Sequence, residues 1–332
     1  MDPVFYVISL AEPPRDPLVP GTPSKIVEFD GSLFVAARSR LFAAPVAGGE
    51  WKASPTAPSG GGFDVAATVG FLYALSGNGT ENRLFRIGAA ALGSGGGWDE
   101  VAVSAGADAI FAIGNRLFVS VPAEGGGYSI FSVADDESSS SLILSGASML
   151  TGSAGSFLSA IGGVYRWDGS ALSPVGTGIF MGIIELPSGD VVAAHHDGRL
   201  FSVSSGGIDA MTTTGGASLR IGSRATGALA VANVADTDSS DRVLVAGRQS
   251  PAGQSAFGYV EFALTASGAI DPSLNAQSGA GLRSILHPDR FSTSLGRHSV
   301  NRLFFKEGAG FFASTAATGL WLYEENRWRV VE

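Results

Sequence analysis

The sequence has 332 residues, of which 45% are hydrophobic, only 15% are charged and 47 are glycine. Low charge argues against long solvent-facing helices, whereas many glycines suit short strands joined by tight turns. The net charge of −9 disfavours general binding to nucleic acid or anionic membranes, which needs positive potential, and the absence of cysteine excludes disulfides, thiolate metal sites and a Cys nucleophile.

The chain opens with VFYVISL, followed by AEPPRDP. This stretch lacks the positive flank of a signal peptide, and no apolar run approaches the ~20 residues of a membrane helix. We expect residues 1–25 to form an N-terminal strand, Val4 to Leu10, and a Pro-rich linker, Pro13 to Pro23. If the protein is exported to the periplasm or cell surface, as we expect, its targeting segment is not part of this sequence.

A unit of four short strands then recurs along the chain. In the first copy, KIVEFD turns at Asp30-Gly31 into SLFVAA, followed by RLFAAPV and, after Gly48-Gly49, by EWKAS. Asp-Gly and Gly-Gly turns between short apolar runs are the hairpin signal. The seven copies begin near residues 26, 63, 107, 147, 179, 227 and 300.

Radial repetition of such units predicts an all-β fold, a seven-bladed β-propeller of four-stranded antiparallel blades, spanning residues 26–332 as one domain. A β-sandwich or two small barrels are the alternatives, but seven comparable units suit neither. We further expect Val4 to Leu10 to add an edge strand to the last blade and so close the ring.

Two stretches, VYRWDG and GLWLYEENRW, resemble the third and fourth strands of bacterial β-propellers of the two-component-regulator and Kelch-like kinds. Gly162-Gly163 with Tyr165 approaches the Kelch pattern. The sialidase box Ser-x-Asp-x-Gly-x-x-Trp and the Gly-His pairs of WD40 blades are absent. The resemblance implies the superfold, and a fold alone does not carry a function.

Two connections between blades are unusually long, from Thr212 to Thr226 and from Pro272 to Ser299, and long loops in compact folds are often functional. They concentrate positive charge against a single carboxylate, Asp289. The residues that we expect to bind a ligand or partner are Arg220, Arg224, Arg283, His287, Arg290, Arg297 and His298 in these connections, and Arg248 in a neighbouring turn. Guanidinium groups bind carboxylate, sulfate or phosphate bidentately, although these arginines could instead pair with acidic groups of neighbouring blades.

Two polar clusters could hold a metal. His195-His196-Asp197 lies at a turn, where adjacent strand residues point to opposite faces and an ordinary turn is the simpler interpretation. Asp236, Asp238 and Asp241 resemble the start of a Ca²⁺ loop but lack the glycine and distant glutamate of an EF-hand. Asp-Ser runs also form plain turns.

No Gly-x-Ser-x-Gly nucleophile elbow is present. A sialidase-like glycosidase would need a Tyr nucleophile with a Glu partner, for which Tyr259 and Glu261 on one strand are the only suggestion. The sequence therefore favours a non-catalytic binding or scaffold propeller, without a cofactor, that contacts a protein partner through a loop-rich face. The alternative is a lectin or glycosidase that holds an acidic sugar through the arginines, for which exposed tryptophans beside them would be evidence.

Overall fold

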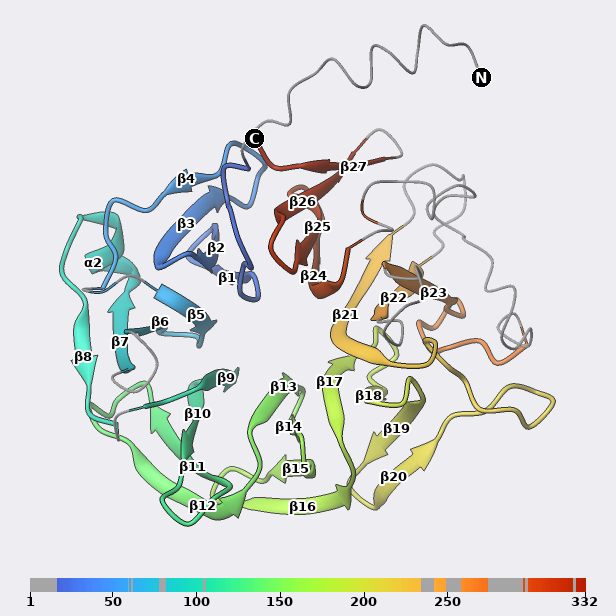
Figure 1. Ribbon diagram of the computed structural model, residues 1–332. Helices are drawn as coiled ribbons and strands as arrows, with labels where there is room; N and C mark the ends of the chain where they lie inside the picture. Colours follow the sequence, from blue (N-terminus) through green and yellow to red (C-terminus); the bar gives the residue numbers. More distant parts are fainter. Residues whose placement is uncertain are drawn as a thin grey trace, which may run out of the picture.

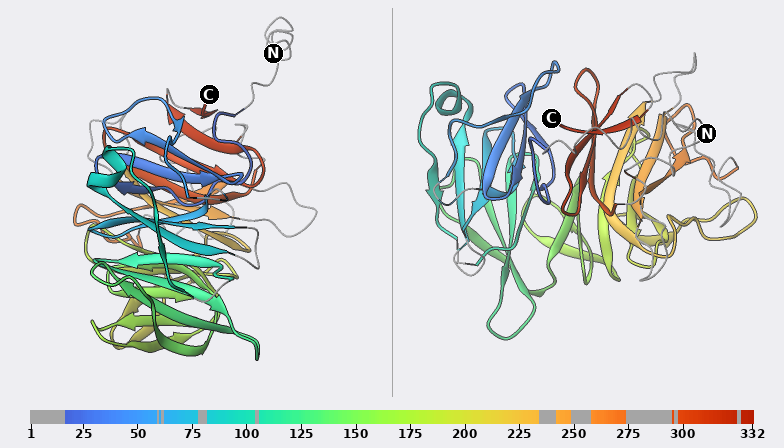
Figure 2. Two further views of the ribbon diagram at one scale, coloured as in Figure 1. Left: turned by 90° about the vertical axis from the view of Figure 1, so that its left-hand side faces the viewer. Right: turned by 45° about the horizontal axis from the view of Figure 1, so that its top comes forward.

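The computed structural model describes residues 17–58, 60, 62–77, 82–103, 106–233, 242–248, 258–273, 295, 298–324 and 327–332. Seven antiparallel sheets are arranged around one axis, with the first strand of each sheet nearest the centre and the last at the rim (Figure 1). Figure 2 shows the same ring from the side and from above its upper edge. The chain therefore forms a seven-bladed β-propeller, as the repeats predict.

The strands follow one another outward in every blade. Blade 1 contains β1 (Val27–Phe29), β2 (Ser32–Ala37), β3 (Arg40–Pro45) and β4 (Lys52–Ala53). Blade 2 contains β5 (Gly62–Ala67), β6 (Phe71–Ser76), β7 (Arg83–Gly88) and β8 (Asp99–Val101), with the short helix α2 (Ala89–Gly93) before β8. Blade 3 contains β9 (Ala109–Ile113), β10 (Arg116–Pro122), β11 (Tyr128–Ala134) and β12 (Ser141–Ala147). Blade 4 contains β13 (Leu150–Ala154), β14 (Phe157–Ala160), β15 (Gly163–Trp167) and β16 (Leu172–Thr177).

Blade 5 contains β17 (Phe180–Glu185), β18 (Val191–His195), β19 (Leu200–Ser204) and β20 (Gly207–Ala210). Blade 6 contains β21 (Ala225–Asn233), β22 (Arg242–Arg248) and β23 (Tyr259–Ala263). Blade 7 contains β24 (Val300–Lys306), β25 (Gly310–Thr315), β26 (Gly319–Glu324) and β27 (Arg327–Val330).

Within the described residues, the sheet of blade 6 has three full strands, and the predicted fourth is represented by a short pairing. At the fourth position an isolated antiparallel bridge joins Leu264 to Ile270, and Asp271 N donates to Ala263 O at 3.0 Å. Pro272 follows directly. Proline has no backbone N–H, so Pro272 cannot donate a further hydrogen bond to this pairing.

The local sequence explains the hairpins. In the first one, Phe29 pairs with Ser32 across Asp30 and Gly31, whose φ angles are +47° and +71°. Two successive residues with positive φ match the twist of the flanking strands, and Asp-Gly adopts this turn readily. The second strands carry nearly unbroken apolar runs, such as SLFVAA in β2, because blades cover both of their faces.

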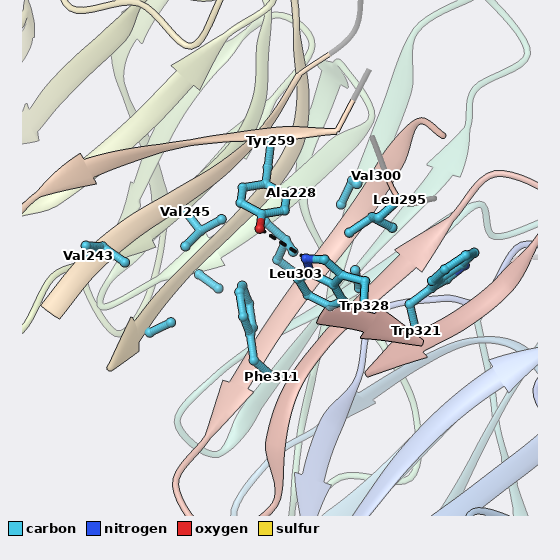
Figure 3. Close-up of a cluster of buried hydrophobic side chains, with 13 residues drawn as sticks. Ala228, Val243, Val245, Tyr259, Leu295, Val300, Leu303, Phe311, Trp321 and Trp328 are labelled. Carbon is cyan, nitrogen blue, oxygen red and sulfur yellow. Dashed lines mark hydrogen bonds between the residues drawn. The ribbon is translucent and has the colours of Figure 1, made fainter. Parts of the chain in front are cut away.

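The hydrophobic core lies between neighbouring blades. Blades 6 and 7 enclose the cluster of Figure 3, in which Trp328 Nε1 donates a 3.0 Å hydrogen bond to the Tyr259 hydroxyl. The Phe311 ring packs against Trp328, with ring centroids 5.1 Å apart. An aromatic side chain with a polar group thus fills the interface and has that group satisfied.

A strap of residues 17–24 closes the ring against blade 7. Leu18 N donates to Val331 O at 2.9 Å, and Leu320 N donates to Val19 O at 3.1 Å. The Ser314 hydroxyl is 3.1 Å from Pro23 O. All four strands of blade 7 come from the end of the chain, so this strap joins the two ends of the ring. The predicted strand from Val4 to Leu10 lies outside the described residues.

The strap allows a test of ring closure. Val19 has no exposed surface and packs with Leu320 and Val331. We expect Val19→Ala to lower the free energy of unfolding by about 1.5–3 kcal/mol, the value of burying such a side chain, as measured by urea titration. Val69→Ala is the control, because Val69 is 82% exposed. Equal midpoints for the two variants would contradict a stabilising role for the strap.

Candidate functional site

The long connection from Thr212 to Thr226 is folded back on blade 5. Its first part is a small hairpin, in which Thr212 pairs with Ser218. Its second part runs beside the β18–β19 turn. There the backbones of Arg220 and Arg199 form an isolated antiparallel β-bridge, and Ile221 N donates to Gly198 O at 2.7 Å. Backbone hydrogen bonds therefore fix where the arginines of this connection lie.

The structure brings together three of the residues predicted to bind. Arg220 and Arg224 are exposed, and Arg248 at the end of β22 is partly buried. The side chain of Arg248 lies against Gly222, which stands between the other two in sequence, so that a Cβ at Gly222 would be 3.7 Å from Arg248 Cδ. We call Arg199, Arg220, Arg224 and Arg248 the arginine sector.

His298 is linked to this sector through the backbone. Arg248 N donates to Gly258 O, and Gly258 N donates to His298 O, both at 3.0 Å. The His298 ring packs at 5.6 Å from the ring of Trp321 in blade 7. The other predicted binding residues, Arg283, His287, Arg290 and Arg297, lie outside the described residues, as do the Ca²⁺ candidates Asp236, Asp238 and Asp241.

Sequence reasoning missed Arg199, which follows the turn at Asp197. Arg199 Nε donates to Asp197 Oδ2 at 2.7 Å, and Arg220 Nη1 donates to Asp197 O at 3.2 Å. Burial acts to raise the pKa of Asp197, but contacts from His195 and from the backbone and side chain of Arg199 outweigh it and lower that pKa to about 2. The carboxylate therefore stays ionised and neutralises one of the four arginines.

His195 and His196 adopt different environments. His195 is largely buried, with its Nδ1 2.8 Å from Asp197 Oδ1, an electrostatic contact in which the ring N–H is not directed at the oxygen. His196 is exposed, and the two ring centroids are 4.4 Å apart. Within the described residues, no three His, Asp or Glu side chains form a group that could hold a metal ion.

Tyr259 and Glu261 are buried in blade 6, with 3% and 1% of their surface exposed. Tyr259 accepts the hydrogen bond from Trp328, so it fills the interface between blades 6 and 7. Trp51, Trp321 and Trp328 are also buried. These tyrosine and tryptophan side chains therefore pack in the core and do not form an exposed aromatic surface beside the arginine sector.

A second polar group, also missed from the sequence, lies at the axis of the ring. A cavity of ≈170 Å³ there is lined by the Lys25 and Arg302 side chains and by residues of five inner strands. Both carboxylate oxygens of Asp64 accept hydrogen bonds from the ammonium group of Lys25, at 2.6 and 2.7 Å. The ammonium group also lies 4.5 Å from the centre of the Phe111 ring.

Burial shifts the pKa values of the two cations at the axis, Lys25 and Arg302. It lowers the pKa of Lys25; the nearby carboxylate of Asp64 acts to raise this pKa, whereas the charge of Arg302 lowers it further. It likewise lowers the pKa of Arg302, again opposed by Asp64. A guanidinium group stays protonated in proteins, so the axis carries two cations and one carboxylate while Lys25 is charged.

A recurring β-bulge brings single residues of the inner strands to the axis. In blades 2, 4, 5 and 7 the pairing with the second strand slips after the first residue and resumes at the third. The third residues are Asp64, Gly152, Gly182 and Arg302. Bulges turn side chains into new directions, and three of these residues line the cavity while Asp64 holds Lys25.

Comparison with known proteins shows the fold alone. No protein-family model matches the sequence, and no curated protein matches it. Among solved structures, YCF48 bound to D1 peptide is 11% identical, covers 96% of this chain and 94% of its own, and has a TM-score of 0.54. The GH74 enzyme of Niastella koreensis is 13% identical and covers 92% of this chain, with a TM-score of 0.58.

The extracellular domain of a putative one-component system, BT4673 of B. thetaiotaomicron, is 10% identical and covers 92% of this chain, with a TM-score of 0.54. The present chain spans 39% of that protein and 52% of the GH74 enzyme. All three similarities reflect the propeller fold. No helix among the described residues is long and apolar enough to cross a membrane.

The lowered pKa of Asp197 gives a pH-dependent prediction. The folded-state pKa of about 2 is below the unfolded value of about 3.9, so the stabilisation is present above pH 4 and is lost as pH falls towards 2. We expect Asp197→Asn to reduce the free energy of unfolding by about 0.5–1 kcal/mol at pH 7, because the pair is partly solvated. In denaturant titrations at pH 7, 4 and 2.5, the difference in the free energy of unfolding between Asp197→Asn and wild type should become smaller as the pH falls.

Asp209→Asn is the matched control, since exposed Asp209 makes no side-chain hydrogen bond or ion pair with the described residues. A deficit of Asp197→Asn that stayed constant down to pH 2.5 would contradict this account of the turn.

Proposed function

We propose that this chain is a non-catalytic binding propeller that holds an acidic segment of a partner protein on the arginine sector. The observation that carries the proposal is the exposed pair Arg220 and Arg224, fixed by backbone hydrogen bonds beside Arg248 in a molecule of net charge −9. Arg224 makes no hydrogen bond or ion pair with the described residues, so its guanidinium is available to a ligand.

The electrostatics favour an anionic partner. Two arginines of the sector, Arg199 and Arg220, donate hydrogen bonds to Asp197, and the sequence places further cations in the connection that ends at Ser299. A positive patch on an acidic protein steers anionic segments to one place and repels them elsewhere. The guanidinium fork suits the carboxylates of Asp and Glu side chains.

The comparisons give support of a general kind. One similar structure is a propeller bound to a peptide, and another is an extracellular domain. A peptide ligand and an extracytoplasmic location for the present chain agree with them, and both belong to this proposal. The sector lacks an exposed tryptophan among the described residues, which favours a peptide over a sugar.

The test is fluorescence anisotropy with a labelled Glu-rich peptide and its Gln analogue. We expect the wild type to bind the Glu peptide, with affinity that falls as salt screens the charges. The double variant Arg220→Ala, Arg224→Ala should bind 5- to 30-fold more weakly, the equivalent of about 1–2 kcal/mol.

The control double variant is Lys52→Ala, Arg83→Ala, which removes two cations from blades 1 and 2, where their side chains are 76% and 63% exposed. It changes net charge equally and should bind as the wild type does. Equal losses in both double variants would reject a specific site. Binding to polygalacturonate but to no peptide would favour the carbohydrate alternative instead.

A further inference from the structure

The axial cavity contains a positive charge that no carboxylate of the described chain neutralises. Asp64 is committed to Lys25, because both of its oxygens accept from the ammonium group, and Oδ1 also accepts from Val65 N at 2.9 Å. Arg302 makes one described hydrogen bond, from Nη1 to Asn301 O at 3.2 Å, and no described ion pair. Among the described residues, most of its five N–H donors therefore have no protein partner.

Such a charge is costly in this position. An ion removed from water loses several kcal/mol of hydration unless opposite charge and hydrogen bonds replace it. Arg302 is partly buried where it lines the cavity, and burial lowers its pKa. An anion within the cavity would supply both the charge and the hydrogen bonds.

Two glycines, Gly182 and Gly227, contribute backbone to the lining of the cavity. Gly182 and Gly227 stand where the backbones of β17 and β21 meet, and a Cβ at Gly182 would collide with Gly227 O. Gly227 has a φ of +85°, which side-chain-bearing residues rarely adopt. At these two positions the cavity is therefore lined by backbone, without a side chain.

The remaining lining indicates what kind of anion fits. Phe111, Ile183, Leu229 and Leu303 contribute apolar surface to the cavity. The hydroxyl of Ser153, also in the lining, makes no hydrogen bond with the described residues. Ligand sites typically combine an apolar wall with a few polar groups that fix orientation.

The volume of the cavity limits the size of the anion that it can hold. The cavity measures ≈170 Å³, and an apolar cavity of about 150 Å³ can hold benzene. It is too small for a drug-sized ligand, which occupies about 300 Å³ or more. One carboxylate with a tail of a few carbon atoms would match the single uncompensated charge, the guanidinium fork and the apolar wall.

We propose that the axial cavity is a binding site for a small organic carboxylate, with Arg302 as the group that holds the carboxylate and Ser153 as an additional hydrogen-bond donor. Lys25, held by Asp64, adds positive potential at the rim of the site. This site differs from the arginine sector in every residue, so neither proposal rests on the other.

Isothermal titration calorimetry at pH 7 and constant ionic strength tests the site, with butyrate, benzoate and sulfate as probes. We expect wild type to bind butyrate or benzoate at one site and sulfate at least tenfold more weakly, because sulfate has no apolar tail. Arg302→Gln should weaken carboxylate binding at least tenfold. Arg302→Lys, which keeps the charge but loses the fork, should give an intermediate loss.

Two controls keep the result interpretable. The Arg220→Ala, Arg224→Ala variant should bind butyrate as wild type does, which separates this site from the arginine sector. Circular dichroism identifies variants that fold, and Ser153→Ala provides a milder substitution if Arg302→Gln does not fold; it should weaken binding several-fold. The proposal is overturned if wild type shows no saturable carboxylate binding, if sulfate binds as tightly, or if folded Arg302 variants bind unchanged.

Discussion

The close approach of the β17 and β21 backbones is the constraint on which the centre of this propeller depends. A Cβ at Gly227 would collide with Met181 O, and one at Gly182 with Gly227 O. Blades 5 and 6 can therefore meet at the axis only as bare backbone. Beside this contact lies the axial cavity, which Gly182 and Gly227 line together with Lys25 and Arg302.

The two polar regions of the molecule use charge in different ways. In the arginine sector, Asp197 neutralises part of an exposed cluster, and water screens the remaining charge, so each contact there is worth little by itself. At the axis, the same types of group are largely shielded from water, so that an unmatched charge there is costlier than at the surface. The axis can therefore hold a small ligand with few groups, whereas the sector needs an extended one.

The fold could be predicted because its signals are local. A turn such as Asp30-Gly31 between two apolar runs indicates a hairpin. Repetition of such hairpins along the chain is compatible with few protein architectures. The two arginine-containing connections could be predicted for the same reason, because they are long interruptions of the repeat. The axial group of Lys25, Asp64 and Arg302 could not be predicted from the sequence. Lys25, Asp64 and Arg302 are far apart in sequence, and each resembles an ordinary charged residue of a strand or its flank. The bulges that bring Asp64 and Arg302 to the axis depend on inter-strand register, which short motifs do not specify.

The tetrapeptide Asn-Arg-Leu-Phe shows why the depth of a strand could not be read locally. It occurs three times: across the start of β7, a third strand, of β10, a second strand, and of β24, an inner strand. The arginine is 63% exposed in β7 and 24% exposed in β10, whereas in β24 it is Arg302, inside the ring. Identical local sequence therefore yields a surface cation, a partly covered one and a cavity-lining one. What differs is the number of strands that separate each from the axis, and that number follows from the whole ring.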